Sequence, residues 1–198
     1  FQALFTNTTA SYNTAVGSAS LDANTTGTEN SAVGYGALGA NTTGSNNVAM
    51  GSGALDANTT ASDNTALGTS ALTSNTTGNS NVAVGKDALN QNTTASQNTA
   101  VGVYALDGAT TGQENTAVGY EALTSNVTGR DNTAVGRQCL KSQTGSYTTA
   151  IGNEAGEANT ADHNVFIGRR AGYQVTTGTQ NIYIGSGAGS NCGTGSQN

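Results

Sequence analysis

A short unit of polar and apolar residues, Asn13-Thr14-Ala15-Val16-Gly17, recurs along nearly the whole chain. Eleven copies begin at residues 13, 30, 47, 64, 81, 98, 115, 132, 148, 164 and 181, so the step is 17 residues except for two steps of 16. A fixed short period predicts a solenoid, in which each repeat buries its apolar side only against its neighbours. We therefore expect an all-β, parallel β-solenoid (β-roll) of about eleven coils, roughly 55 Å long at ~4.8 Å per strand.

Two apolar columns are expected to form a thin core. Alternation along a strand puts Thr14 and Val16 on one face and Ala15 on the other. We expect the Val16 column to face the coil interior and to meet a leucine column that lies four residues beyond each strand-ending glycine. The first column is Val16, Val33, Met50, Leu67, Val84, Val101, Val118, Val135, Ile151, Ile167 and Ile184, and the second is Leu4, Leu21, Leu38, Leu55, Leu72, Leu89, Leu106, Leu123 and Leu140.

An unbroken alanine column occupies the opposite face of the strands, at Ala15, Ala32, Ala49, Ala66, Ala83, Ala100, Ala117, Ala134 and Ala150. It predicts a close-packing interface with another chain or sheet, the alternative being exposed alanine that is merely tolerated. Burial of one Val and one Leu stabilises a coil by ~3–6 kcal/mol, whereas ordering its 17 residues costs on the order of 25 kcal/mol, which favours an oligomer. The glycines at Gly17 and its equivalents are expected to form sharp corners with positive φ.

The repeat pattern divides the rod into two parts. Residues 1–140 are regular repeats with the leucine column, and residues 141–198 are variant repeats that continue the same rod. In the second part the leucine column becomes Gly156, Gly172 and Gly189, and the alanine column becomes Phe166 and Tyr183, as if the bulk had changed faces. A changed fibre cross-section or subunit packing explains this, and a local binding surface is the alternative. The charges that would form such a surface are Arg130, Asp131, Arg137, Lys141, Glu154, Glu157, Asp162, His163, Arg169 and Arg170.

Composition narrows the class of protein. Only 34% of the residues are hydrophobic, yet only 9% are charged and none is proline, a combination that favours order over disorder once the repeat is considered. The net charge of −6 and the absence of basic clusters argue against a nucleic-acid partner, and no apolar run predicts membrane insertion. Cys139 and Cys192 lie about three coils apart, too far for a disulfide. Both ends of the sequence fall within a repeat, so we expect a longer fibre or end-to-end stacking of subunits.

Seven sequons follow the repeat and predict a possible row of N-glycans, at Asn7, Asn24, Asn41, Asn58, Asn75, Asn92 and Asn126. The alternative, which we favour, is that Asn and Thr form turns and that stacked Asn side chains hydrogen-bond between coils. The adjacent Thr25 and Thr26 suggest an ice-binding hypothesis, although at most one of these threonine columns can face outward. The single histidine, His163, lies far from both cysteines in sequence, so we expect no catalytic site, metal site or cofactor.

The unit Asn-Thr-Ala-Val-Gly-x-x-Ala-Leu-x-x-Asn-x-Thr-Gly, as in residues 115–129, resembles the repeats of phage-type tail fibre proteins. Its strand is also similar to the repeat in the heads of trimeric autotransporter adhesins. The resemblance implies a left-handed β-roll, a homotrimer or end-to-end fibre, and an extracellular, cell-surface or virion location. It implies a non-enzymatic structural rod that extends and supports attachment to a surface, with surface glycans as possible partners. A repeating extracellular matrix filament, possibly glycan-coated, and a flat-face sugar- or ice-binding module are the alternatives.

Overall fold

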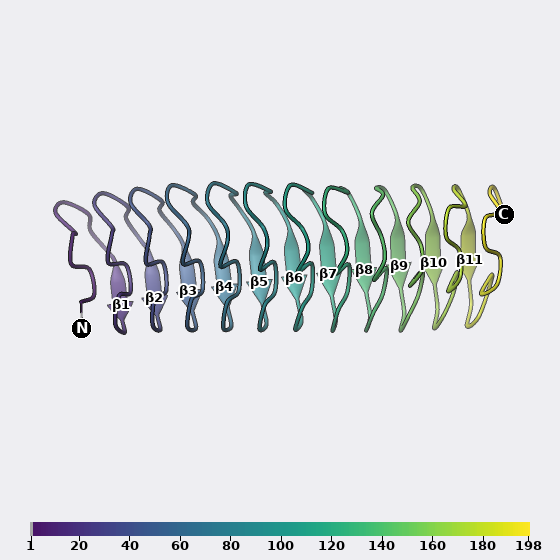
Figure 1. The fold of residues 1–198 in the computed structure, drawn as a ribbon, viewed down its shortest axis with the longest axis horizontal. Coiled ribbons are helices and arrows are strands. Elements are labelled where there is room, and N and C mark those ends of the chain that lie inside the picture. The colour runs from purple at the N-terminus through teal and green to yellow at the C-terminus, as the bar shows by residue number, and fades with distance from the viewer. Residues whose placement is uncertain (1) are drawn as a thin grey trace.

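The protein is a rod of stacked coils, in which each coil contributes one short strand to a single sheet (Figure 1). The computed structural model describes residues 2–198, and no helix is present among them. The strands are β1 (Thr14–Val16), β2 (Ser31–Val33), β3 (Val48–Met50), β4 (Thr65–Leu67), β5 (Val82–Val84), β6 (Thr99–Val101), β7 (Thr116–Val118), β8 (Thr133–Val135), β9 (Thr149–Ile151), β10 (Val165–Ile167) and β11 (Ile182–Ile184). The predicted parallel β-solenoid is confirmed.

Each strand pairs in parallel with the next, and like positions lie opposite one another. Ala15 pairs with Ala32, and the two 16-residue steps keep the same register, because Ala134 pairs with Ala150 and Ala150 with Phe166. The sheet therefore runs without interruption from β8 into β9, β10 and β11. Backbone hydrogen bonds between coils continue outside the strands, so every side of the coil is tied to its neighbours.

The core lies between the alanine column of the sheet and the leucine column on the opposite wall. The predicted burial of the leucines is confirmed from Leu21 to Leu140, each of which is fully buried, while Leu4 is partly buried. The alanine column from Ala32 to Ala150 is fully buried in the same cluster. The prediction that these alanines form a close-packing interface with another chain or sheet is therefore wrong, because they lie in one core with the leucines of their own chain.

The prediction that the Val16 column faces the interior is also wrong. Val16, Met50, Leu67, Val101, Val135, Ile151 and Ile184 are exposed, and Val33, Val84, Val118 and Ile167 are only half-buried. The physical reason is space, since a leucine projecting from one wall of a thin coil leaves room only for a methyl group on the other. The larger side chain at every second strand position must therefore point outward.

Four positions of each regular coil have positive φ, and two of them, the strand-ending glycine and the leucine, border the core. The strand-ending glycines lie at φ between 125° and 141°, as expected, and a Cβ on Gly34 would approach the carbonyl oxygen of Gly51 within 2.5 Å. The leucines from Leu4 to Leu140 lie at φ between 48° and 54°, a conformation that costs a non-glycine residue roughly 1–2 kcal/mol. Each buried leucine also bonds the next coil, as Leu38 N–H does to the Ala54 carbonyl oxygen at 3.0 Å. Burial and this hydrogen bond offset the backbone cost.

The bulky residues of the variant repeats remain in the core. Phe166 replaces an alanine and is fully buried, and its ring lies where side chains at Gly156 and Gly172 would otherwise project. Tyr183 takes the same position in β11 and fills the space above Gly189. The bulk has therefore moved across one core, from the leucine wall to the sheet, and has not changed faces.

Candidate functional site: the outward face of the sheet

The outward face of the sheet carries two side-chain columns from the first and third residue of every strand. The third-residue column is the aliphatic series that begins at Val16, and the first-residue column contains only Thr, Ser, Val and Ile. Exposure is substantial, at 57% for Val16, 48% for Met50 and 66% for Ile184. No charged residue occurs in either column, so the strands present an uninterrupted neutral surface.

The size of this surface follows from strand geometry. Three residues span about 10 Å along a strand, and eleven strands at ~4.8 Å span about 50 Å, which gives a flat face of roughly 500 Å². Thr or Ser occupies seven of the eleven first-residue positions, so the aliphatic column makes up about half of this face. The largest apolar patch on a typical monomer is about 300–600 Å² and is often functional, so this face has the size of an interaction site. Polar and charged residues flank the strands at the positions of Glu29, Asp63, Lys86 and Arg137. An apolar centre with a polar rim is the usual anatomy of a protein–protein interface.

The sequon asparagines lie inside the rod. Asn24, Asn41, Asn58, Asn75, Asn92 and Asn126 are fully buried, and Asn7 is partly buried. Asn41 Nδ2 donates to Asn24 Oδ1 at 2.9 Å and to the Gly44 carbonyl oxygen at 3.0 Å, and this arrangement continues from Asn7 to Asn92. Ala109 interrupts the stack, so Asn126 Nδ2 bonds only the Gly129 carbonyl oxygen of its own turn. The amide nitrogen that would carry a sugar is thus occupied and enclosed. The glycosylation hypothesis conflicts with this fold, and the favoured alternative, hydrogen-bonded asparagine stacks, is confirmed.

A second internal stack is formed by the asparagine before each strand. Asn30 Nδ2 donates to the Gly44 carbonyl oxygen at 2.8 Å, and Asn30 Oδ1 accepts from the Asn47 backbone N–H at 3.0 Å. These side chains are fully buried and satisfied on both sides. Because each amide bridges two coils, the two asparagine stacks fix the coil spacing and stiffen the rod.

The turn threonines divide as the sequence suggested. Thr25 is half-buried, and its hydroxyl donates to the Thr42 carbonyl oxygen of the next coil at 3.0 Å. Thr26 and its equivalents Thr43, Thr60, Thr77, Thr94 and Thr111 are exposed. Only one column of turn hydroxyls therefore faces solvent, and the other stabilises the stack.

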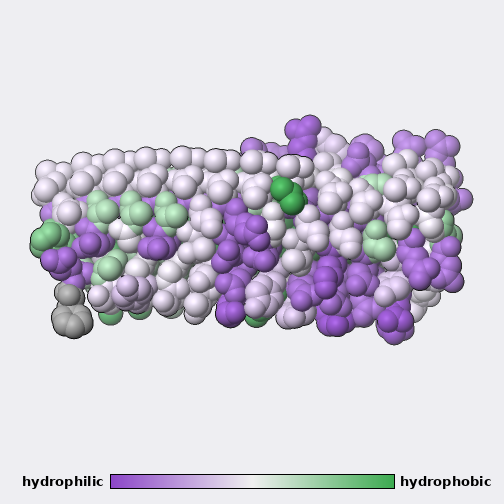
Figure 2. Space-filling model, viewed as in Figure 1, coloured by the Kyte–Doolittle hydropathy of each residue, from purple (hydrophilic) through white to green (hydrophobic). Residues whose placement is uncertain are grey.

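The charges of the later coils pair with one another along one edge of the rod. Arg137 Nη1 and Arg170 Nε donate to the two oxygens of Glu154 at 2.9 and 2.6 Å, and Lys141 Nζ donates to Glu121 Oε2 at 2.7 Å. Hydrogen bonds from Arg170 and then Arg137 lower the pKa of Glu154. In Figure 2 hydrophilic residues gather over the C-terminal half of the rod. These charges link neighbouring coils, so much of their capacity to bind a ligand is already used.

The residues with catalytic potential are dispersed. Cys139 is fully buried, its Sγ donates to the Ala150 carbonyl oxygen at 3.3 Å, and burial raises the pKa of its thiol to about 12. Cys192 is an exposed free thiol, and His163 stacks on Tyr147 with ring centroids 5.0 Å apart. Among residues 2–198 no three His, Cys, Asp or Glu side chains are grouped so as to hold a metal ion. The same part of the chain contains no helix long and apolar enough to cross a membrane.

Comparison of the chain with protein-family models, with curated proteins and with solved structures found no match. The resemblance to tail fibre and adhesin-head repeats therefore stays a prediction. The functional argument for this protein depends on its own surface, and above all on the outward face of the sheet.

Proposed function

We propose that this protein is a non-enzymatic structural rod that extends and supports attachment to a surface, and that it works as a homo-oligomer joined through the outward face of its sheet. The observation that carries the proposal is the exposed aliphatic column from Val16 to Ile184, on a face without charge. A homotrimer would bring three such columns to a common axis and remove them from water. We propose an extracellular, cell-surface or virion location on the resemblance of the repeat alone.

The interior supports a mechanical role. The coil has a thin core of alanine and leucine, and much of its cohesion comes from hydrogen bonds between coils. Backbone bonds and two buried asparagine stacks repeat along the rod, so each coil resists displacement from its neighbours. A stack of this kind keeps its ends at a fixed separation, which is the property that an extension element needs.

The proposal is tested by placing one charge on the outward face. Val101→Lys puts an ammonium group in the middle of the aliphatic column, and Thr94→Lys puts the same group at an exposed turn seven residues earlier in the chain. We expect sedimentation velocity to give three times the 19.5 kDa chain mass for the unmodified protein and for Thr94→Lys. Val101→Lys should sediment as a monomer, because pairing would bury an uncompensated charge.

Two outcomes would overturn the proposal. The unmodified protein could remain monomeric at the highest concentration reached, or Val101→Lys could associate as well as Thr94→Lys does. Circular dichroism of both variants shows whether the coils themselves remain folded. Electron microscopy of the associated protein then distinguishes discrete rods, which we expect, from filaments of indefinite length.

A further inference from the structure

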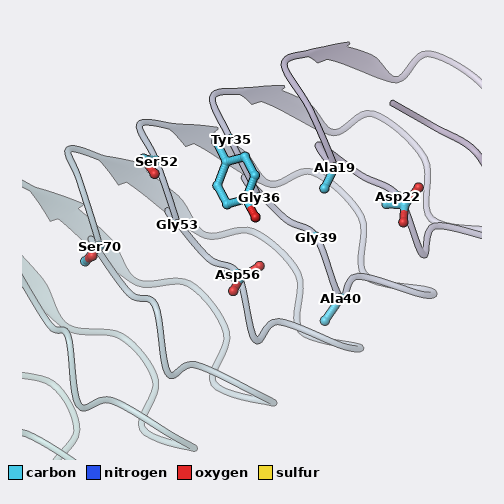
Figure 3. A pocket seen from close by; sticks show the side chains of 10 residues that line it. All are labelled: Ala19, Asp22, Tyr35, Gly36, Gly39, Ala40, Ser52, Gly53, Asp56 and Ser70. Atoms are coloured by element: carbon cyan, nitrogen blue, oxygen red, sulfur yellow. The ribbon is translucent and has the colours of Figure 1, made fainter. Parts of the chain in front are cut away.

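A hollow lies on one edge of the rod, just beyond the ends of β1 to β4 (Figure 3). It has a volume of about 430 Å³, within the range of small-ligand sites. Tyr35 stands near its centre, with Asp56 below it and Asp22 to its right, and Gly36, Gly39 and Gly53 contribute bare backbone (Figure 3). The hollow is separate from the outward face of the sheet, because its residues follow the strand-ending corners.

The hollow exists because side chains are missing from a position that is filled elsewhere. Gly36 and Gly53 occupy the place that Asp87, Tyr104 and Glu121 take in later coils. In those coils the side chains interlock, as when Lys86 Nζ donates to Tyr104 Oη at 3.2 Å. Gly39 likewise falls between Asp22 and Asp56 in register. The three glycines therefore remove the contacts that close this edge of the rod farther along.

Tyr35 offers an unoccupied ring surface. It is 69% exposed, and within residues 2–198 its ring has no stacked aromatic partner and no cation over it. By contrast, Tyr104 packs edge-on against Tyr120 with centroids 6.3 Å apart. An aromatic face carries partial negative charge and attracts the weakly positive C–H groups of an apolar ring face.

The acidic residues supply hydrogen-bond acceptors with spare capacity. Asp22 Oδ1 is buried and has no hydrogen-bond partner among the described residues, so this carboxylate is not neutralised or saturated by the protein's own donors at that oxygen. Partial burial raises the pKa of the Asp56 carboxyl. No Lys or Arg lines the hollow, so phosphate, sulfate and carboxylate ligands would be repelled.

We propose that this hollow binds a neutral pyranose sugar, whose C–H face stacks on Tyr35 and whose hydroxyl groups donate to the carboxylates of Asp22 and Asp56. A pyranose has an apolar ring face, which complements the Tyr35 ring, and a set of hydroxyl donors, which complement the carboxylates. The inference goes beyond the rod proposal and does not depend on self-association. It would give an attachment rod a specific contact with a carbohydrate surface.

The test is saturation-transfer NMR with the methyl glycosides of glucose, galactose, mannose and N-acetylglucosamine. Two variants alter the hollow, and each introduces the residue found at the equivalent position of a nearby coil. Tyr35→Ser introduces the residue at Ser52, and Gly39→Thr introduces the residue at Thr73. The control is Tyr12→Asn, which removes another exposed tyrosine and inserts the residue found at Asn46. We expect saturation to reach the ring C–H groups of at least one glycoside. The affinity for that glycoside should be unchanged in the control and about tenfold weaker in Tyr35→Ser. Gly39→Thr should abolish binding by filling the space.

Three results would overturn the proposal. The first is that no glycoside receives saturation, the second is that binding survives both hollow variants in folded protein, and the third is that calorimetry detects Ca²⁺ binding while every sugar gives no signal. Thermal melting of each variant shows whether it is folded. Because the readout is sugar binding and not chain mass, failure here leaves the rod proposal standing, and failure of the rod proposal leaves this one standing.

Discussion

Replacing Phe166 by alanine should open the largest cavity that one substitution can make in this thin core. Phe166 is the bulkiest fully buried side chain among the described residues, and its ring stacks near Tyr183 with centroids 6.1 Å apart. Truncation of a buried phenylalanine usually costs about 3–5 kcal/mol. The coil should collapse little, because hydrogen bonds to both neighbouring coils fix its backbone. We therefore expect a loss in the upper half of that range.

A second substitution in the same coil should restore part of the lost stability. A side chain at Gly172 would overlap the Phe166 ring, so Gly172→Leu alone should destabilise by overpacking, by about 1–3 kcal/mol or more. In the Phe166→Ala background this leucine would enter the vacated space. The backbone accepts it, because Gly172 lies at φ 62° and Leu123 lies at φ 54° in a regular coil. We expect the double variant to recover about 2–3 kcal/mol, so the effect of Gly172→Leu changes sign.

Urea unfolding followed by circular dichroism measures the free energy of unfolding of the three variants. Sedimentation at the same concentration checks that their association state is the same. Val127→Ala is the control, because Val127 is an exposed aliphatic residue of a turn, outside both the core and the outward face of the sheet. It should cost clearly less than Phe166→Ala. Additive effects of Phe166→Ala and Gly172→Leu, or a larger loss for Val127→Ala than for Phe166→Ala, would refute the assignment of alanine and leucine columns to one shared core.

Three further predictions follow from buried and paired groups. A maleimide should label Cys192 rapidly and leave Cys139 unmodified until the protein unfolds, as peptide mass mapping would show, because Cys139 is fully buried with its thiol pKa raised to about 12. Asn75→Ala should lower the free energy of unfolding by about 1–3 kcal/mol for each buried partner left unsatisfied. Urea unfolding measures this loss, and a variant as stable as the unmodified protein would contradict the buried stack. Hydrogen bonds from Lys141 and then Gln138 lower the pKa of Glu121 from 4.5 to about 2, so its stabilising contribution is present above pH 4.5 and is lost as the pH falls through about 2. Carboxyl NMR titration should show that low midpoint, and Lys141→Gln should move it upward.

The sequence was sufficient for the parts of the fold that depend on period. Strand positions, parallel pairing and the leucine wall all follow from the 17-residue step, since stacking places like residues together. Left-handed φ angles at the leucines were not predictable from residue type, because leucine rarely adopts them. The hollow was missed for a related reason. Its signal is an absence of side chains at Gly36 and Gly39 beside Tyr35, and it appears only when residues from neighbouring coils are placed next to each other.

The orientation of the strands was mispredicted because a three-residue strand has no unambiguous apolar side. Thr-Ala-Val can bury either alanine or valine, and greater hydrophobicity favoured valine. The variant repeats contained the deciding information. Where Phe166 replaces alanine, Gly156 and Gly172 replace leucine, while the outward column stays aliphatic at Ile151 and Ile167. Exchange of volume between two positions indicates that they share one enclosed space. The alanine and leucine columns must then face each other, which leaves the valine column outside and available to a partner.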